Sequence, residues 1–256
     1  MAELAQAVLS PVVPQLAKLR RIAIVPSLNE QETIGRLIDE IRAFDPGFEI
    51  LVVDDGSTDR TAAIAEARGA HVLALPFNLG IGGAVQTGYL YARANGFELA
   101  VQIDGDGQHN PQEVARLVGP ILDGTADMVV GTRFVEGGGY RGTRPRRLGI
   151  HLFAALVSLI VRQRVTDTTS GFRAVNRRGI RLFAADYPHD YPEVEATVLL
   201  SRHGLKMVEV PVVMRLRGEG RSSITTLRSV YYMVKVLLAL FVGLFRKNVT
   251  PLEDTK

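Results

Sequence analysis

The chain has 256 residues, of which 46% are hydrophobic and 22% are charged, and its formal net charge at pH 7 is +3. This length and composition indicate a globular protein with one large α/β domain, or such a domain with an appendage. The sequence contains no cysteine, which excludes a disulfide framework and a thiolate metal site. Residues 1–20 lack a basic segment followed by an apolar run, so we expect an N-terminal extension rather than a signal peptide.

The first half of the chain alternates short apolar runs with helical patterns. We expect strands at 21–27, 48–55, 71–77, 97–104 and 126–133, with intervening helices at 31–44, from Ser57 or Thr58 to Ala67, at 82–96 and at 111–122. This alternation predicts right-handed βαβ units and a mostly parallel sheet flanked by helices. Ligands of such sheets bind beyond the carboxyl ends of the strands. Because the segments SLNE, DDGSTD, FNLG and DGDGQ follow four of these strands, we expect them to form one site.

The positive charge gathers in the second half. Of the 30 basic residues, 25 are arginine, and the segment from Arg133 to Arg181 holds 11 of them against only Glu136 and Asp167. Arginine makes forked contacts to phosphate and lies well against anionic headgroups. A solvated basic face is the alternative, but apolar runs are interleaved with these charges. The pattern therefore favours a phosphate-bearing partner, a membrane surface, or both.

Two of these apolar runs are long. Residues 148–161 are interrupted by the basic side chain of His151 alone, and residues 229–245 by that of Lys235 alone. Both are shorter than the roughly 20 apolar residues of a membrane-spanning helix. The first is either a core helix or part of an interfacial helix within 144–164. The second is expected to lie in or dip into the headgroup region, or to pack on a membrane partner. We therefore expect an extension at 1–20, the main domain at 21–225, and an apolar, membrane-associating helix with a tail at 226–256.

The segment QIDGDGQH carries two carboxylates one glycine apart. Alternate residues of an extended segment point the same way, so Asp104 and Asp106 can converge on one hard cation. Oxygen ligands suit Mg²⁺ or Mn²⁺ that is shared with substrate phosphates. An isolated Asp-x-Asp is also typical of a solvated turn, but here it follows a buried strand of the predicted sheet.

Two further segments suggest a nucleotide. Asp54 and Asp55 end the second strand, where a carboxylate can bind a base edge or a ribose hydroxyl; the alternative is that Ser57, Thr58 or Asp59 only caps the next helix. NLGIGGAVQTG does not match the dinucleotide fingerprint, because Val85 occupies the last glycine position and the segment follows the third strand. Its glycine-rich helix start, with Gly82, still suits a nearby nucleotide.

Seven segments occur together in a familiar order: IVPSLNE, VVDDGSTD, NLGIGGAVQTGY, QIDGDGQH, GTR, DTTSGFRAVNR and MRLRGEGRSSI. Over residues 20–225 the chain resembles family 2 glycosyltransferases of GT-A fold, and within them the polyprenyl-phosphate branch that includes dolichyl-phosphate mannose synthases. The resemblance implies an α/β GT-A fold and inverting sugar transfer from a nucleotide-diphosphate sugar. Two departures bear on it. Gly220 to Ser223 differ from the Gly-x-Ser-Lys often seen in the dolichol branch, which leaves the sugar open. The short C-terminal appendage leaves the mode of membrane attachment open.

The resemblance also implies roles for individual residues. Nucleotide-sugar contacts are implied for Pro26, Asn29, Glu30, Asp54, Asp55, Gly82 and Asp104. The divalent cation, Mg²⁺ or Mn²⁺, is implied to bind Asp104, Asp106 and Gln108. Acceptor-phosphate contacts are implied for Arg133, Arg146, Arg147 and Arg217. The residues expected to be catalytic are Asp104, Asp106, Arg133, Arg217 and, for one kind of acceptor, Glu195.

The acceptor decides whether a base is needed. A lipid phosphate is already largely anionic at neutral pH and needs arginines, whereas a hydroxyl acceptor needs a carboxylate to remove its proton. We expect a UDP- or GDP-linked sugar, a polyprenyl phosphate and a membrane surface as partners, with a small membrane protein as a further candidate and no nucleic acid. The expected location is the cytoplasmic face of the membrane, peripheral or shallowly inserted.

Three other functions are less favoured. The first is transfer to a glycan or lipid hydroxyl, with Glu195 or Glu193 as base, although two exposed glutamates at a helix start explain that segment as well. The second is a silent nucleotide-sugar-binding subunit, which would have no need of intact Asp104, Asp106 and Gln108. The third is a sugar nucleotidyltransferase, which would want glycine and lysine near the first strand, where PSLNEQET has neither.

Overall fold

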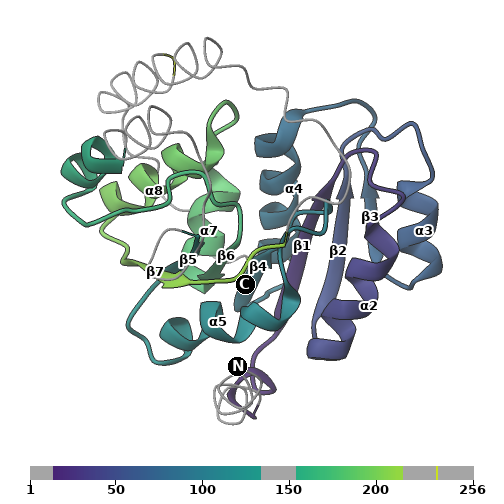
Figure 1. Cartoon of the computed structure of the whole chain (residues 1–256), viewed down its shortest axis with the longest axis horizontal. Coiled ribbons are helices and arrows are strands. Elements are labelled where there is room, and N and C mark those ends of the chain that lie inside the picture. The colour runs from purple at the N-terminus through teal and green to yellow at the C-terminus, as the bar shows by residue number, and fades with distance from the viewer. Residues whose placement is uncertain (1–13, 134–153, 216–234, 236–256) are drawn as a thin grey trace.

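The structure is a computed structural model that describes residues 14–133, 154–215 and 235. One seven-stranded sheet, in the order β3-β2-β1-β4-β6-β5-β7, runs through the described residues (Figure 1). Its strands are β1 (Arg21–Ser27), β2 (Glu49–Asp54), β3 (His71–Ala74), β4 (Leu99–Gln102), β5 (Met128–Thr132), β6 (Arg173–Asn176) and β7 (Met207–Pro211). The helices are α2 (Ile34–Phe44), α3 (Thr61–Ala67), α4 (Gly80–Ala94), the 3₁₀ turn η1 (Pro111–Glu113), α5 (Val114–Leu122), α7 (Arg177–Ala185) and α8 (Pro192–Arg202).

The predicted mostly parallel sheet is confirmed, with one exception. β1 pairs in parallel with β2 and β4, β2 with β3, and β5 with β7, whereas β6 runs antiparallel to both β4 and β5. The carboxyl ends of the six co-directed strands therefore meet at one edge of the sheet. Because β6 runs the other way, its amino end lies at this same edge and brings the segment before Arg173 there.

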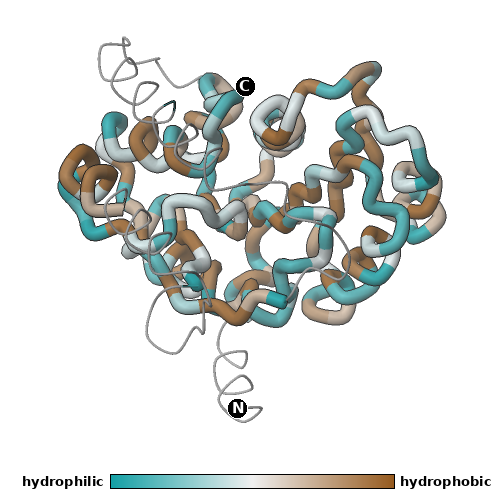
Figure 2. Tube along the Cα trace, turned by 45° about the horizontal axis from the view of Figure 1, so that its top comes forward, coloured by the Kyte–Doolittle hydropathy of each residue, from teal (hydrophilic) through white to brown (hydrophobic). Residues whose placement is uncertain are grey.

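The sheet is buried on both faces. Along β1, Ile22 and Ile24 pack in one hydrophobic cluster with residues of α4, α7 and α8, while Ala23 and Val25 pack in a second cluster with residues of α2 and α5. This alternation follows from the two-residue period of a strand, and burial on both sides is typical of parallel sheets. Figure 2 shows the result as hydrophobic segments concentrated in the interior.

Most predicted boundaries differ from the structure by a few residues, and three of these differences have a visible cause or bear on the site. Helix α3 begins at Thr61 instead of Ser57 or Thr58, because both of these residues hydrogen-bond Asn29 in the preceding loop. Strand β3 ends at Ala74 instead of residue 77, close to Pro76, which has no N–H to donate. Strand β4 ends at Gln102, so both motif aspartates lie in the loop beyond it.

The first long apolar run is helical where it is described, at residues 154–161. Val157 is fully buried in the core, whereas Leu159 is 75% exposed and Leu156 is 37% exposed. The run therefore has both a core face and an exposed apolar face. Residues 144–153 of the possible interfacial helix lie outside the described residues, and so does the apolar run at 229–245 apart from Lys235. Within the described ranges, no helix has the length and hydrophobicity needed to cross a bilayer.

Candidate active site

The loops after β1 and β2 are tied together by Asn29. Its backbone N–H donates to Ser57 Oγ at 2.8 Å, and its side-chain Oδ1 accepts from the Thr58 N–H at 2.9 Å. Asn29 has a φ of 56°, a left-handed conformation that asparagine tolerates better than most residues. Ser57 and Thr58 therefore link two loops and do not cap α3, whose first residue, Thr61, donates its N–H to Asp59 at 2.9 Å.

The two aspartates at the end of β2 are buried. Asp54 Oδ1 accepts from the Ser57 N–H at 3.1 Å, and Asp55 Oδ1 accepts from the Leu79 N–H at 2.7 Å. Each carboxylate thus fixes a loop at the predicted edge, Asp54 its own loop and Asp55 the one that leads into α4. Their contact with a nucleotide stays a prediction.

Three other predicted nucleotide contacts have structural partners. Pro26 accepts the Gly105 N–H at 3.1 Å, which joins the end of β1 to the aspartate loop. Glu30 donates its N–H to Thr61 Oγ1 at 2.8 Å. A Cβ on Gly82 would lie 2.4 Å from the Pro188 carbonyl oxygen, so the packing of α4 on this neighbouring segment already requires glycine there. The role of these residues in nucleotide binding stays a prediction.

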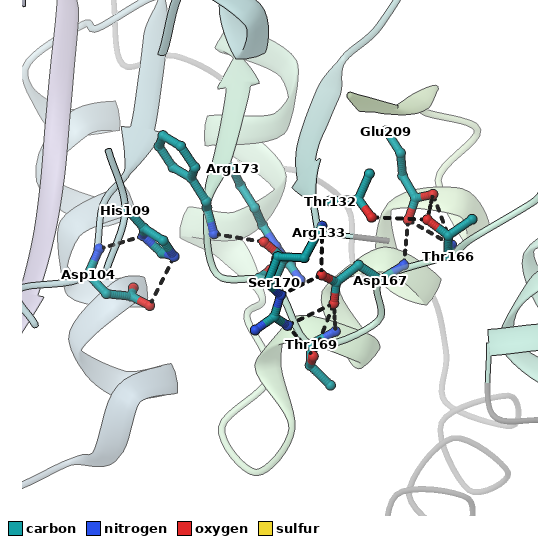
Figure 3. A network of polar contacts seen from close by, with 11 residues as sticks. Asp104, His109, Thr132, Arg133, Thr166, Asp167, Thr169, Ser170, Arg173 and Glu209 are labelled. Atoms are coloured by element: carbon teal, nitrogen blue, oxygen red, sulfur yellow. Dashed lines mark hydrogen bonds and ion pairs between the residues drawn. The ribbon is translucent and has the colours of Figure 1, made fainter. Parts of the chain in front are cut away.

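Asp104 is held on three sides, and Figure 3 shows its two contacts with His109. Its N–H donates to His109 Nδ1 at 3.0 Å, and its Oδ1 accepts from Gln102 Nε2 at 3.1 Å. His109 is buried, stacks on Phe172 with ring centroids 4.7 Å apart, and places Nε2 3.7 Å from Asp104 Oδ2. A Cβ on Gly171 would lie 2.9 Å from the same Oδ2. The position of the Asp104 carboxylate is therefore set by its neighbours before any ligand binds.

Asp106 is oriented by Gln108. Its Oδ1 accepts from the Gln108 N–H at 3.0 Å, and its Oδ2 accepts from Gln108 Nε2 at 2.8 Å. With the amide nitrogen directed at Asp106, the amide oxygen of Gln108 is the atom that can ligate a cation. Within the described residues, no three acidic or histidine side chains are grouped so that they would hold a metal by themselves. A cation at this loop therefore needs further ligands, which substrate phosphates commonly supply.

Arg173 is a site residue that the sequence reasoning missed. It is 1% exposed, donates Nε to the Ser170 carbonyl at 2.9 Å, and donates Nη2 to the Glu193 carbonyl at 2.5 Å. Its Nη1 and the Oε1 of Gln102, its partner across the β4–β6 pair, are buried without a hydrogen-bond partner. Arg173 thus joins the segment beside Asp104 to the first turn of α8. The segment DTTSGFR carried the resemblance, but only the reversed direction of β6 shows that it reaches the site.

The first turn of α8 holds Glu193 and Glu195, as the helix-start interpretation predicted. Both side chains are half-buried. Burial raises the pKa of Glu193; the guanidinium of Arg173 and a backbone hydrogen bond oppose this shift, and the carboxylate of Asp104 adds to it. The negative charge of Asp104 therefore acts on the Glu193 carboxyl. The interpretation of Glu193 and Glu195 as two exposed glutamates is wrong.

Arg133 is held by a buried acid. Its Nε donates to Asp167 Oδ2 at 2.9 Å and its Nη2 to Asp167 Oδ1 at 3.1 Å, a forked pair that Figure 3 shows. The other arginines predicted to bind acceptor phosphate, Arg146, Arg147 and Arg217, lie outside the described residues. The described segment that ends at Arg215 reaches the aspartate loop, because the Arg215 N–H donates to the Gln108 carbonyl at 2.8 Å.

Comparison with known proteins gives a consistent result. Residues 22–183 match the family model described as glycosyl transferase family 2. The polyprenol monophosphomannose synthase of Mycolicibacterium smegmatis is 32% identical over 80% of this chain and 81% of its own length. The undecaprenyl-phosphate mannosyltransferase of Micrococcus luteus is 32% identical over 81% of this chain and 88% of its own length.

A solved structure agrees with the fold. Glucosyl-3-phosphoglycerate synthase from Mycobacterium tuberculosis, in complex with Mn²⁺, UDP and phosphoglyceric acid, superposes with a TM-score of 0.70 at 25% identity. The match covers 93% of this chain and 83% of that chain. The GT-A-like arrangement of sheet and helices is thereby confirmed.

Proposed function

Because this chain belongs to glycosyl transferase family 2, we propose that it moves a sugar, with inversion, from a nucleotide-diphosphate sugar to a polyprenyl phosphate. The donor is UDP- or GDP-linked, and the carrier is undecaprenyl or dolichyl phosphate. The enzyme works at the cytoplasmic face of a membrane, peripherally or shallowly inserted, with a small membrane protein as a further candidate partner.

One observation carries this proposal: the aspartate loop and a fixed arginine share one edge of the sheet. Asp104 and Asp106 follow β4, and Arg133 follows β5 and forms an ion pair with Asp167. The first pair suits the diphosphate of a donor, through a cation, and the arginine suits the phosphate of an acceptor. The two mannosyltransferase relatives, whose names specify polyprenol and undecaprenyl phosphate, support a polyprenyl phosphate as the acceptor.

The loop also fits a hard divalent cation. Asp104 and Asp106 supply carboxylate oxygens and Gln108 an amide oxygen, which are the ligand types that Mg²⁺ and Mn²⁺ prefer. The Mn²⁺ in the structure of the mycobacterial synthase supports a cation of this kind. When bound, it neutralises the charge that develops on the departing diphosphate.

The arginines bind and orient the acceptor. A phosphomonoester has a second pKa of about 6, so its oxygen is already anionic at neutral pH and attacks the anomeric carbon without a general base. As the new bond forms, the bond from the sugar to the diphosphate breaks. Arg133 and Arg217, with Arg146 or Arg147, hold the phosphate in line for this attack. In support, the described chain passes the aspartate loop at Arg215, two residues before Arg217.

A second candidate function is transfer to a glycan or lipid hydroxyl. The observation that favours it is Glu193, which is half-buried and close enough to Asp104 for that carboxylate to raise its pKa. Of the two glutamates in α8, Glu193 is therefore the better candidate for a general base than Glu195.

The proposed function is tested by the product. The protein is incubated with undecaprenyl or dolichyl phosphate in vesicles, with Mg²⁺ or Mn²⁺ and with a panel of radiolabelled UDP- and GDP-sugars. We expect one donor to give label that extracts into organic solvent and is released by mild acid, as a sugar phosphodiester is. Label that stays on a water-soluble glycan, or on an acid-stable lipid, would reject the lipid-phosphate acceptor and favour the second candidate.

A further inference from the structure

We propose that Glu209, in the middle of β7, is a positioning residue that holds Arg133 through Asp167 and so sets the affinity for the acceptor phosphate. This inference rests on the proposed function of Arg133. Glu209 lies in the apolar strand Met207–Pro211, where a carboxylate between two valines contributes nothing to the core. Its role must therefore be sought in what the carboxylate contacts.

The carboxylate of Glu209 receives hydrogen bonds from one short segment. Oε1 accepts the Thr166 N–H at 2.9 Å and the Asp167 N–H at 3.0 Å, and Oε2 accepts the same Thr166 N–H at 2.9 Å and the Thr166 hydroxyl at 2.8 Å. Thr166 Oγ1 also lies 3.1 Å from Thr132 Oγ1, the residue before Arg133 (Figure 3). Glu209 thus fixes both the backbone and the side chain of the segment that approaches the end of β5.

Asp167 passes this constraint to Arg133. Its side chain is fully buried and accepts from Arg133 Nε, Nη2 and backbone N–H, at 2.9, 3.1 and 3.3 Å. Thr169 adds its N–H and its hydroxyl to Oδ1 at 3.1 and 3.0 Å. A carboxylate saturated in this way has one position and one orientation, and so has the guanidinium paired with it.

The consequence is preorganisation. A flexible arginine loses side-chain freedom when it binds a phosphate, and a guanidinium fixed beforehand avoids that loss. The fixed end of the relay is Glu209, because it is anchored in a strand that pairs with β5 along its whole length, from Met128 with Met207 to Thr132 with Pro211. Through the contacts Glu209–Asp167–Arg133, the paired strands β5 and β7 therefore restrain the position of an arginine that lies in a loop.

The test compares Glu209→Ala with Glu209→Gln. Alanine removes all the hydrogen bonds to the segment. Glutamine preserves three of the four, since its Oε1 accepts both N–H groups and its Nε2 donates to Thr166 Oγ1, which then donates to Thr132 Oγ1; only the second contact of the Thr166 N–H, to Oε2, is lost. We expect Glu209→Ala to raise the KM for polyprenyl phosphate roughly tenfold, as for the loss of a charge-assisted contact. We expect Glu209→Gln to stay within about twofold of the parent, because geometry rather than charge is transmitted.

Three measurements make the result specific. The Kd for UDP and GDP, by calorimetry, should be unchanged in both variants, and thermal melts should show that both fold. In an Arg133→Ala background, Glu209→Ala should have no further effect on the KM, because the guanidinium that Glu209 positions is then absent. If Glu209→Ala does not fold, Thr166→Val removes the two contacts of the Thr166 hydroxyl, to Glu209 and to Thr132, and should also raise the KM for polyprenyl phosphate.

Equal loss of nucleotide and acceptor binding, additive effects with Arg133→Ala, or a normal KM in a folded Glu209→Ala would each overturn the inference. So would a Glu209→Gln that behaves like Glu209→Ala. Failure of the proposed function looks different, because the parent protein itself would then form no lipid-linked product.

Discussion

Asp106 lies in a loop that is already shaped for a ligand. Both of its carboxylate oxygens accept hydrogen bonds from Gln108, one from the backbone and one from the side chain. Asparagine at this position would keep one oxygen, lose the negative charge, and point an N–H₂ at a donor. A substitution of Asp106 therefore leaves the core unchanged but disturbs the hydrogen bonds of the loop.

We predict that Asp106→Asn lowers sugar transfer by about 100-fold or more, the loss typical of removing a preorganised charge-stabilising group. The fold should remain, as judged by circular dichroism and thermal melting. Turnover is measured with Mn²⁺, with Mg²⁺ and with EDTA. Asp123→Asn is the matched control, since Asp123 is exposed at the end of α5, in the turn that leads to the opposite edge of the sheet. Normal turnover of Asp106→Asn without any divalent ion would remove the metal role.

At this scale the sequence predicted the acids better than their partners. The spacing of Asp104 and Asp106 after a strand marked both as candidate ligands, and the structure places both in the loop beyond β4, while their role in binding a cation stays a prediction. Asp167 and Glu209 were not recognisable, since an acid that orients an arginine has no local pattern. Their roles depend on contacts that span 34 residues for Arg133 with Asp167 and 42 for Asp167 with Glu209.

Among the elements, β6 shows why part of the site stayed out of reach. Alternating apolar runs and helices predict β1 to β5, because each strand and its crossover are local features. Strand β6 is only four residues long, and nothing in RAVN says that it enters between β4 and β5 in the opposite direction. That direction is a property of the assembled sheet, and it places Gly171 beside Asp104 and Arg173 opposite Gln102.

Helix α8 carries the residue that separates the two acceptor classes. With a phosphate acceptor no base is needed, so Glu193→Gln should keep turnover within about fivefold of the parent, and Glu195→Gln likewise. With a hydroxyl acceptor, Glu193→Gln would abolish turnover. The parent would also lose activity as the pH falls through the pKa of Glu193, which burial holds above its ordinary value of 4.5. Initial rates of both variants across pH decide between these outcomes, and a collapse confined to Glu193→Gln would contradict the lipid-phosphate acceptor.

For the whole molecule, one ion pair joins segments that the sheet alone does not hold. Arg21 forks onto Asp45, with Nε to Oδ2 at 2.7 Å and Nη2 to Oδ1 at 2.9 Å, and its Nη1 donates to the Leu16 carbonyl at 2.9 Å. The pair links residues before β1, the start of β1 and the end of α2. Burial would raise the pKa of Asp45, but the hydrogen bonds from Arg21 and from the Gly47 N–H, with the charge of Arg21, lower it overall.

We therefore predict that Asp45→Asn lowers the free energy of unfolding at pH 7 by about 3–5 kcal/mol, because it leaves the buried Arg21 without a counter-charge. A carboxyl whose folded pKa is depressed stabilises the protein above its unfolded pKa of about 3.9, and that stabilisation is lost as the pH falls through the lower folded pKa. The gap between parent and variant, measured by urea unfolding from pH 7 downward, should thus be constant to about pH 5 and shrink below pH 4. Asp39→Asn is the control: its pair with Arg68 is half exposed, so it should cost less than about 1 kcal/mol. If the Asp45 gap did not narrow in acid, the pair would not be what holds these segments together.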